Sequence, residues 1–349
     1  MMVFATLFNW FYLPQGIALY RSLERTCKSD FVLYVLCIDE YVATVLAELN
    51  FSKLRLVHLK EIENDRLKAA QATRTIGEFC WTCTTPLLLH VQDIHGPGSI
   101  VSYIDADLCF YSDPEAVIDE LGSRSILIHE HDFAPEHADL RRSSGRFNVG
   151  LVAVRNDREG RTCLETWRDQ CLDECVFDPA AGKCGDQNYL DDWPALYPSL
   201  GISANPGIGL APWNISKYRL ESSSSAVIVD GRKVVFYHFH SLRLLRPRFG
   251  VKPVVMAGGA YVFSDQIIKL FYQPYARDLW RAVANINRIH EKKGVKRDYE
   301  MEFPTLPHEY QKLLNDQLLF CFGERAIPSR YRVQLMEWLY GIDADKSHL

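Results

Sequence analysis

Residues 99–114 read Ser-Ile-Val-Ser-Tyr-Ile-Asp-Ala-Asp-Leu-Cys-Phe-Tyr-Ser-Asp-Pro, and they are the most informative part of the chain. An apolar segment, predicted as a buried strand over 100–104, runs directly into Asp105 and Asp107. The carboxyl edge of an open α/β sheet is where such folds bind ligands. Two neighbouring carboxylates repel unless a cation lies between them, and a hard divalent ion shared with substrate phosphates is the usual cation. The stretch therefore predicts a metal-assisted site for a phosphate-containing substrate, with a simple turn or helix cap as the alternative.

Composition is that of an ordinary globular protein. The 349 residues suit one large domain or a domain with an appendage, and they are 48% hydrophobic and 24% charged. A net charge of -5 gives no global reason to bind nucleic acid. Basic clusters at 141–142, 243–248 and 292–297 are expected to be solvated, with an anionic substrate or a membrane surface as the alternative.

The ten cysteines are scattered through predicted helices and strands, which fits buried thiols in a reducing cytoplasm better than a disulfide framework. Cys80 and Cys83 have the spacing of zinc ligands, and Cys171 and Cys175 could complete a set. The first pair lies in a helical pattern without turn residues, so zinc is not expected. Residues 1–13 lack the basic start of a signal peptide, and no segment reaches membrane-spanning length. We therefore predict a cytoplasmic protein.

Strands and helices are expected to alternate along the first half of the chain. Strands over 3–8, 31–38 and 54–59 alternate with helices over 13–26 and 41–49, which is typical of βαβ units and a parallel sheet. Helical segments over 61–92 include Pro86, expected in a first turn. The remaining predicted elements are strands at 100–104, 125–128, 147–155, 226–229 and 233–239 and helices at 158–175 and 264–291. The pattern predicts an α/β catalytic domain over residues 1–255 and a helical extension over 256–349.

Three later segments complete a constellation with the aspartate pair. They are Arg-Phe-Asn-Val-Gly at 146–150, Gly-Asp-Gln-Asn-Tyr-Leu at 185–190 and Phe-Tyr-His-Phe-His at 236–240. In this order, over roughly residues 1–250, the chain resembles nucleotide-sugar glycosyltransferases of the GT-A fold, a Rossmann-like mixed sheet flanked by helices. It is most similar to glycosyltransferase family eight, which includes glycogenin and bacterial lipooligosaccharide galactosyltransferases. It is closer still to a group of bacterial nucleotide-diphospho-sugar transferases that share Cys-Trp-Thr-Cys-Thr (80–84) and Gly-Asp-Gln-x-Tyr-Leu-Asp-Asp-Trp-Pro (185–194).

The resemblance implies a metal-bound diphosphate donor. In that family both aspartates and a later histidine hold the ion, which here implies Asp105, Asp107 and His238, with His240 as the competitor on the same face of one strand. The ion stabilises the charge that builds up on the leaving diphosphate. A nitrogen ligand favours Mn²⁺ over Mg²⁺.

The resemblance also implies a set of donor-binding residues. Asp186 and Gln187 would hold the sugar beside its anomeric carbon, although Asp186 could also simply cap the following helix. The other residues implied at the donor are Thr6, Leu7, Asn9, Tyr12, Ala106, Asn148 and Gly150. Arg74, just before the helix that contains Trp81, could balance the charge of the diphosphate, with a surface arginine as the alternative. The chain departs from the family in two places: Phe8 stands where an aspartate is common, and Arg243 or Arg246 would replace a late lysine.

Five residues are candidates for the acceptor side. Trp213 and Asn214 lie in a predicted loop, as does Trp193, and an indole there is either a platform for a sugar ring or a hydrophobic anchor. Asp191 and Asp192 are candidate general bases should the reaction invert configuration. The segment 130–142, rich in His and charge, is a candidate lid.

The sequence thus predicts a metal-dependent hexosyl- or N-acetylhexosaminyl-transferase that uses a nucleoside-diphosphate sugar, UDP-linked by resemblance, with retention. The acceptor would be a glycan, a lipid-linked glycan or a small molecule, and the C-terminal helices could contact a membrane or a second copy. A degenerate scaffold is the first alternative. A phosphohydrolase is the second, although its aspartate pair would belong to the first strand. A nucleotidyltransferase would need a glycine-rich phosphate loop, and residues 7–16 hold only Gly16.

Overall fold

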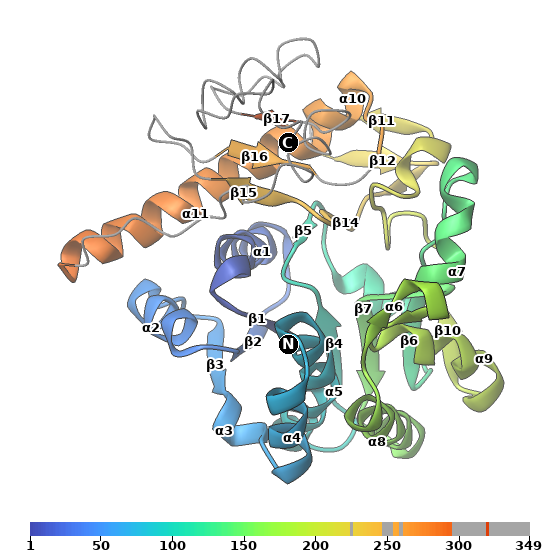
Figure 1. Cartoon of the computed structure of the whole chain (residues 1–349). Coiled ribbons are helices and arrows are strands. Elements are labelled where there is room, and N and C mark those ends of the chain that lie inside the picture. The colour runs from blue at the N-terminus through green and yellow to red at the C-terminus, as the bar shows by residue number, and fades with distance from the viewer. Residues whose placement is uncertain (224–225, 246–253, 258–260, 295–318, 321–349) are drawn as a thin grey trace, which may run out of the picture. The chain divides into compact units, whose positions relative to one another are not determined.

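A seven-stranded mixed sheet forms the centre of the chain's first part (Figure 1). The computed structural model describes residues 1–223, 226–245, 254–257, 261–294 and 319–320. These belong to two compact units, Met1–His238 and Phe239–Leu349. The predicted domain boundary at 255 stays a prediction. Arg246 and most of the predicted C-terminal extension lie outside the described residues.

The strand order of the sheet is β10-β6-β7-β4-β1-β2-β3. Neighbouring strands are parallel in β1–β2, β2–β3, β1–β4 and β10–β6, whereas β7 is antiparallel to both β4 and β6. The strands are β1 Met2–Phe8, β2 Phe31–Cys37, β3 Leu54–His58, β4 Ile100–Ile104, β6 Ile126–Glu130, β7 Phe147–Arg155 and β10 Leu200–Ile202. The predicted α/β class with a mixed sheet is confirmed.

The strand order changes direction at β1. From β1 the chain passes to β2 and β3 on one side of the sheet, and it returns on the other side as β4. The crevice outside the carboxyl ends of two such strands is where open α/β sheets bind ligands. Phe8 is the last residue of β1 and Ile104 is the last residue of β4. Asn9 and Asp105, which follow them, therefore lie at this edge of the sheet.

Helix α5 (Ile76–His95) contacts β1 and β4 and packs against α8 (Arg158–Asp173). Its start is fixed by a capping box: Glu78 N donates to Thr75 Oγ1, and Thr75 N donates to Glu78 Oε2 over 2.9 Å. The predicted place of Pro86 is therefore wrong, because it lies inside α5 rather than in a first turn. The other helices of this unit are α1 Leu13–Thr26, α2 Glu40–Leu49, α3 Leu59–Ile62, α4 Asp65–Thr73, α6 Glu115–Leu121, α7 Arg141–Ser144 and α9 Trp193–Leu196.

A pair of short strands outside the main sheet brings a segment distant in sequence next to the strand that follows β4. Strand β5 (Leu108–Phe110) pairs antiparallel with β14 (Phe236–His238). The predicted strand over 233–239 is wrong, because the chain changes partners: Val234 N donates to Val227 O and Val235 N to Gly207 O before the pairing with β5 begins. The other short strands here are β8 Phe177–Asp178, β9 Lys183–Cys184, β11 Leu220–Ser222, β12 Val227–Val229 and β13 Arg232–Lys233.

The second unit contains a three-stranded antiparallel sheet and a long helical segment. Its strands are β15 Arg243–Leu245, β16 Val254–Met256 and β17 Leu319–Phe320. Helix α10 (Asp265–Ile267), a π-helical stretch (Ile268–Tyr272) and α11 (Gln273–Lys292) follow one another, in agreement with the helices predicted over 264–291. Throughout the described ranges, no helix combines the length and the apolar character that a bilayer crossing requires.

Candidate metal centre

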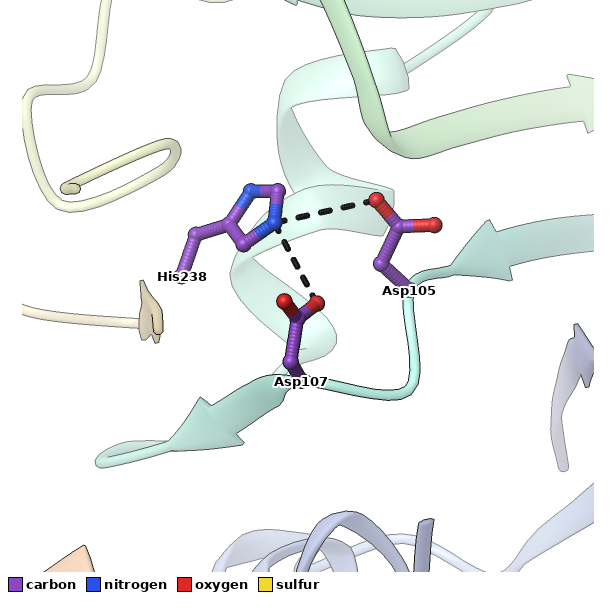
Figure 2. Close-up of side chains that lie close together, drawn as sticks. All are labelled: Asp105, Asp107 and His238. Atoms are coloured by element: carbon purple, nitrogen blue, oxygen red, sulfur yellow. Dashed lines mark ion pairs between the residues drawn. The ribbon is translucent and has the colours of Figure 1, made fainter. Parts of the chain in front are cut away.

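Asp105, Asp107 and His238 lie together, with their side chains directed toward one another (Figure 2). His238 Nε2 is 3.2 Å from Asp107 Oδ1 and 3.8 Å from Asp105 Oδ2. Two ligand atoms at right angles around an ion at about 2.1 Å would be roughly 3.0 Å apart. Two carboxylates and one imidazole at these distances therefore form a donor set that fits a divalent cation.

The backbone explains how these three side chains meet. Asp105 follows the end of β4, where its N–H donates to Gly150 O over 3.0 Å. A tight turn, in which Leu108 N donates to Asp105 O, then leads into β5. His238 stands opposite Leu108 in the β5–β14 pair and so comes next to Asp107. Strand β14 ends at His238, so the prediction that His238 and His240 share one strand face is wrong.

Gly150 leaves room for the histidine. A Cβ at this position would lie 2.8 Å from His238 Nδ1 and 2.5 Å from Asn148 Oδ1, closer than van der Waals contact allows. Glycine is therefore the residue type that fits here without displacing one of these two side chains.

Burial and mutual repulsion shape the charges of the cluster. Burial, together with the nearby charge of Asp107, raises the pKa of Asp105 to about 6, although His238 acts in the opposite direction. Burial lowers the pKa of His238, but the charge and hydrogen bond of Asp107 more than offset it, so the pKa is raised overall. A divalent ion would relieve the repulsion between the carboxylates, which is a physical reason for one to bind.

Asp186 and Gln187 begin the 3₁₀-helical turn over Gln187–Asp192. The Asp186 side chain makes no capping hydrogen bond, so a purely capping role is not what the structure shows. Its carboxyl group is buried, and burial followed by the charge of Asp105 raises its pKa to about 8. Gln187 Oε1 accepts from Asn148 Nδ2 over 3.4 Å, and its Nε2 donates to Cys184 Sγ over 2.9 Å. The structure thus brings Asn148 and Gln187 together, and it brings the charge of Asp186 close to Asp105.

The predicted base and ribose contacts lie at the end of β1. Thr6 and Leu7 belong to β1 and are buried, whereas Asn9 and Tyr12 follow it and are partly exposed. Asn9 Oδ1 accepts from Phe11 N and starts a 3₁₀ turn over Trp10–Tyr12. Ala106 is buried in the turn between the two aspartates. Their contacts with a nucleotide stay predictions.

Arg74 directly follows α4, and its guanidinium donates hydrogen bonds to another helix. It donates to Cys171 O over 2.6 Å and to Leu172 O over 2.9 Å, both in the last turn of α8. A cation at a helix C-terminus stabilises the exposed carbonyl groups there. These bonds give Arg74 a structural role, and its predicted contact with a diphosphate stays a prediction.

The acceptor-side candidates differ in exposure. Trp193 and Trp213 are buried, with 1% and 3% of their surface exposed. The loop predicted at Trp193 is wrong, because Trp193 is the first residue of α9. Asn214 is buried as well, and Asn214 Oδ1 accepts from Ala211 N within its own loop. Both oxygens of the exposed Asp191 accept from Arg146 N, at 2.9 and 3.1 Å, and Asp192 is exposed. A platform role for Trp213 and a role of Asp191 or Asp192 as a base stay predictions.

Two residues that sequence analysis did not single out also belong here. Tyr103 lies two residues before Asp105, and its hydroxyl donates to Asp105 Oδ1 over 3.0 Å. His131 follows β6, and its Nε2 lies 3.2 Å from Asn148 Nδ2. The i, i+2 spacing of Tyr103 and Asp105 is a signal that sequence reasoning could have used, because alternate strand residues face the same side. Nothing local marks His131.

Comparison with known proteins places the chain in a family. It is 35% identical over 240 residues to the uncharacterised protein YfnF of Bacillus subtilis (strain 168), covering 67% of this chain and 79% of YfnF. It is 28% identical over 285 residues to YfnD of the same strain, covering 81% of this chain and 90% of YfnD. The chain therefore belongs to the family of YfnF. A scan against protein-family models found no match.

A solved structure defines the class of fold. The galactosyltransferase LgtC, in complex with donor and acceptor sugar analogs, superimposes with a TM-score of 0.50 at 12% identity, covering 80% of this chain and 95% of LgtC. The mixed sheet flanked by helices is thus the GT-A glycosyltransferase fold, as predicted. At this identity the likeness concerns the fold alone, so membership of family eight stays a prediction.

Proposed function

We propose that this protein is a metal-dependent glycosyltransferase that moves a hexosyl or N-acetylhexosaminyl group from a nucleoside-diphosphate donor, UDP-linked, to a hydroxyl acceptor with retention of configuration. One observation carries the proposal. Asp105, Asp107 and His238 form a donor set for a divalent ion, and that set follows β4 beside the point where the strand order changes direction. The candidate cation site thus lies at the edge where open α/β sheets bind ligands.

Asp105, Asp107 and His238 would hold Mn²⁺, or Mg²⁺ in its place, since the imidazole favours Mn²⁺. When bound, the ion supplies Lewis-acid stabilisation to the departing diphosphate. For this, His238 must present a neutral ring nitrogen and both carboxylates must be ionised. The nucleoside would lie along the end of β1, where we place contacts with Thr6, Leu7, Asn9 and Tyr12. Arg74 and Ala106 complete the proposed donor contacts.

Asp186 and Gln187 would face the donor sugar. Gln187 offers an amide oxygen to the positive charge that develops at the anomeric carbon, and Asn148 and Gly150 line the same side. With retention, the oxygen of the departing diphosphate would take the proton of the acceptor hydroxyl, so the proposal requires no general base from the protein. Inversion would require a carboxylate to deprotonate the acceptor hydroxyl, and Asp192 would be better suited than Asp191, because Asp191 already accepts backbone N–H groups.

The direct test is the thermal stability of the purified protein with UDP, GDP, CDP or ADP, each with Mn²⁺ or with EDTA. A ligand that binds only the folded state stabilises it by about 2.7 kcal/mol at a hundredfold excess over its Kd. We expect UDP to raise the Tm only when Mn²⁺ is present. Asp107→Asn and His238→Gln should lose this shift, whereas His240→Gln and Asp113→Asn should keep it.

Each other outcome has a meaning. A shift with another nucleotide changes the proposed base but keeps the reaction. A metal-independent shift contradicts the metal centre. No shift with any nucleotide overturns the transferase proposal in favour of a degenerate scaffold. Anomer analysis of the product by NMR then decides stereochemistry, since a β-linked product from an α-linked donor contradicts retention.

A further inference from the structure

His131 lies directly after β6, and it is buried with 3% of its surface exposed. Its Nε2 is 3.2 Å from Asn148 Nδ2, and the same Asn148 nitrogen is 3.4 Å from Gln187 Oε1. We propose that His131 is a positioning residue: it fixes the side-chain amide of Asn148, which in turn fixes the orientation of Gln187. The use of this orientation in sugar transfer rests on the function proposed above.

The orientation of the Asn148 amide group follows from the partner of its oxygen. Asn148 Oδ1 accepts from Gly150 N over 2.9 Å, and a backbone N–H can only donate. The amide nitrogen must therefore face the opposite side, where His131 and Gln187 lie. Since an amide nitrogen only donates, both facing atoms must be acceptors. His131 Nε2 must then carry no proton, and this fixes the tautomer of its ring.

The orientation of the Gln187 amide group follows in the same way. With Oε1 accepting from Asn148, its Nε2 is directed at Cys184 Sγ, 2.9 Å away. If the Gln187 amide group were rotated by 180°, its Nε2 would face Asn148 Nδ2, and both nitrogens are donors. The orientation of Gln187, a residue proposed to face the sugar, is thus determined by hydrogen bonds that run from Gly150 N through the amide of Asn148, whose nitrogen is also held by the ring of His131.

His131 is itself held firmly in place. Its backbone N donates to Arg146 O over 2.9 Å, and its carbonyl oxygen accepts from Trp213 Nε1 at 2.8 Å and from Asn214 Nδ2 at 2.9 Å. Its ring stacks on Phe133 at 4.7 Å between centroids and meets the edge of Trp213 at 5.3 Å. Trp213 and Asn214, which sequence analysis places on the acceptor side, thus support the peptide of His131.

Packing of the ring alone does not explain why residue 131 is a histidine. A phenylalanine could keep the contacts of the ring with Phe133 and Trp213, but it would present no acceptor to Asn148. A glutamine could present its amide oxygen about as far along the side chain as Nε2. His131→Phe and His131→Gln therefore separate the role of the acceptor atom from the role of the ring. His95→Phe is a matched control, because it makes the same change at a histidine in the last turn of α5, whose ring nitrogen is bonded to the hydroxyl of Tyr34 and not to Asn148.

The first measurement requires no activity. The side-chain NH₂ signal of Asn148, assigned by its loss in Asn148→Asp, reports whether the amide stays bonded. We expect its protons to exchange with water about tenfold faster in His131→Phe than in wild type or His95→Phe, with slow exchange restored in His131→Gln. Unchanged exchange in His131→Phe, with the fold intact by circular dichroism, would overturn the positioning role.

The second measurement is nucleotide release from the donor sugar nucleotide that wild type uses, with Mn²⁺ and with water as acceptor. His131→Phe should lower kcat about 10- to 100-fold with the donor KM within about threefold, because a misplaced group costs rate more than binding. His131→Gln should recover most of the rate. Equal impairment of both variants would show that only the ring matters and would overturn the proposal. Should wild type turn over no donor, the transferase proposal fails, and the exchange measurement still decides the positioning role.

Discussion

The hydroxyl of Tyr103, a residue of β4, donates over 3.0 Å to Oδ1 of Asp105, which directly follows the strand. Tyr103 is buried, and burial raises the pKa of its hydroxyl well above the ordinary value, so that it stays a donor. The other oxygen of Asp105, Oδ2, is the one near His238. The tyrosine therefore holds one carboxylate oxygen and leaves the other directed at the candidate metal position.

Removing the Tyr103 hydroxyl should weaken metal binding. Partners that orient a metal-ligating side chain are typically worth about 10- to 100-fold in metal affinity. We expect Tyr103→Phe to lower the affinity for Mn²⁺ by about tenfold, measured by isothermal titration calorimetry. Tyr34→Phe, which removes a hydroxyl bonded to His95, should leave the affinity unchanged. Equal affinities in Tyr103→Phe and wild type would show that Asp105 needs no such support.

Gly150→Ala should disturb the metal centre and the fold together. The added methyl group would overlap His238 Nδ1 and Asn148 Oδ1, so one of these side chains must move. Overpacking of this kind costs about 1–3 kcal/mol, which urea unfolding would measure, and Mn²⁺ affinity should fall in the same variant. Gly77→Ala in α5 is the control, because nothing lies within 4 Å of its added Cβ and alanine suits a helix better. A Gly150→Ala variant as stable as wild type would contradict the packing argument.

Arg74→Ala should destabilise the contact between α4, α5 and the end of α8. Its guanidinium donates to Cys171 O and Leu172 O, and these carbonyl groups would lose partners. The expected loss is about 1–3 kcal/mol in the free energy of unfolding, measured with urea. Arg66→Ala is a useful comparison, since its bonds to Asp169 and Asp173 are exposed and worth less. The affinity of Arg74→Ala for a nucleoside diphosphate, measured alongside, decides the predicted diphosphate contact.

The aspartate pair and the sheet around it could be predicted because their signals are local. An apolar run of strand length precedes Asp105, and strands and helices alternate through the first sixty or so residues, so the edge of the sheet follows from pattern and topology. The residues that complete the site depend on contacts distant in sequence. His238 reaches Asp107 only because the chain leaves Val227 and Gly207 and pairs with β5. A period-two pattern at His238 and His240 cannot reveal where such a strand ends.

His131 and Trp213 also show that contacts between residues distant in sequence cannot be predicted from local patterns. A tryptophan in a loop fits a sugar platform and a buried anchor equally well in the sequence, and the tertiary hydrogen bond from Trp213 Nε1 to His131 O has no local sequence signal. His131 lies in a stretch where histidine and charged residues indicate a surface lid, yet it is buried. Burial of a polar residue is set by what covers it, and here that cover comes from Phe133 and Trp213.

Asp186 should make the metal-free protein less stable as pH rises. Its pKa in the fold is about 8, above the ordinary 3.8, chiefly because it is buried. Below about pH 4 the carboxyl group is protonated in both states. As pH rises toward 8, the unfolded chain releases this proton while the folded protein keeps it, so the free energy of unfolding falls by about 1.4 kcal/mol for each pH unit.

Asp186→Asn tests this directly, because an amide of the same shape carries no charge at any of these pH values. In urea unfolding with EDTA between pH 4 and pH 8, the stability of Asp186→Asn should decline with pH less steeply than that of wild type. Asp119→Asn, at an exposed position on α6, should follow the wild-type curve. Parallel curves for wild type and Asp186→Asn would mean that Asp186 ionises freely in the fold. That result would place its carboxylate in contact with solvent and would argue against a buried, uncharged Asp186 beside Asp105 when no metal is bound.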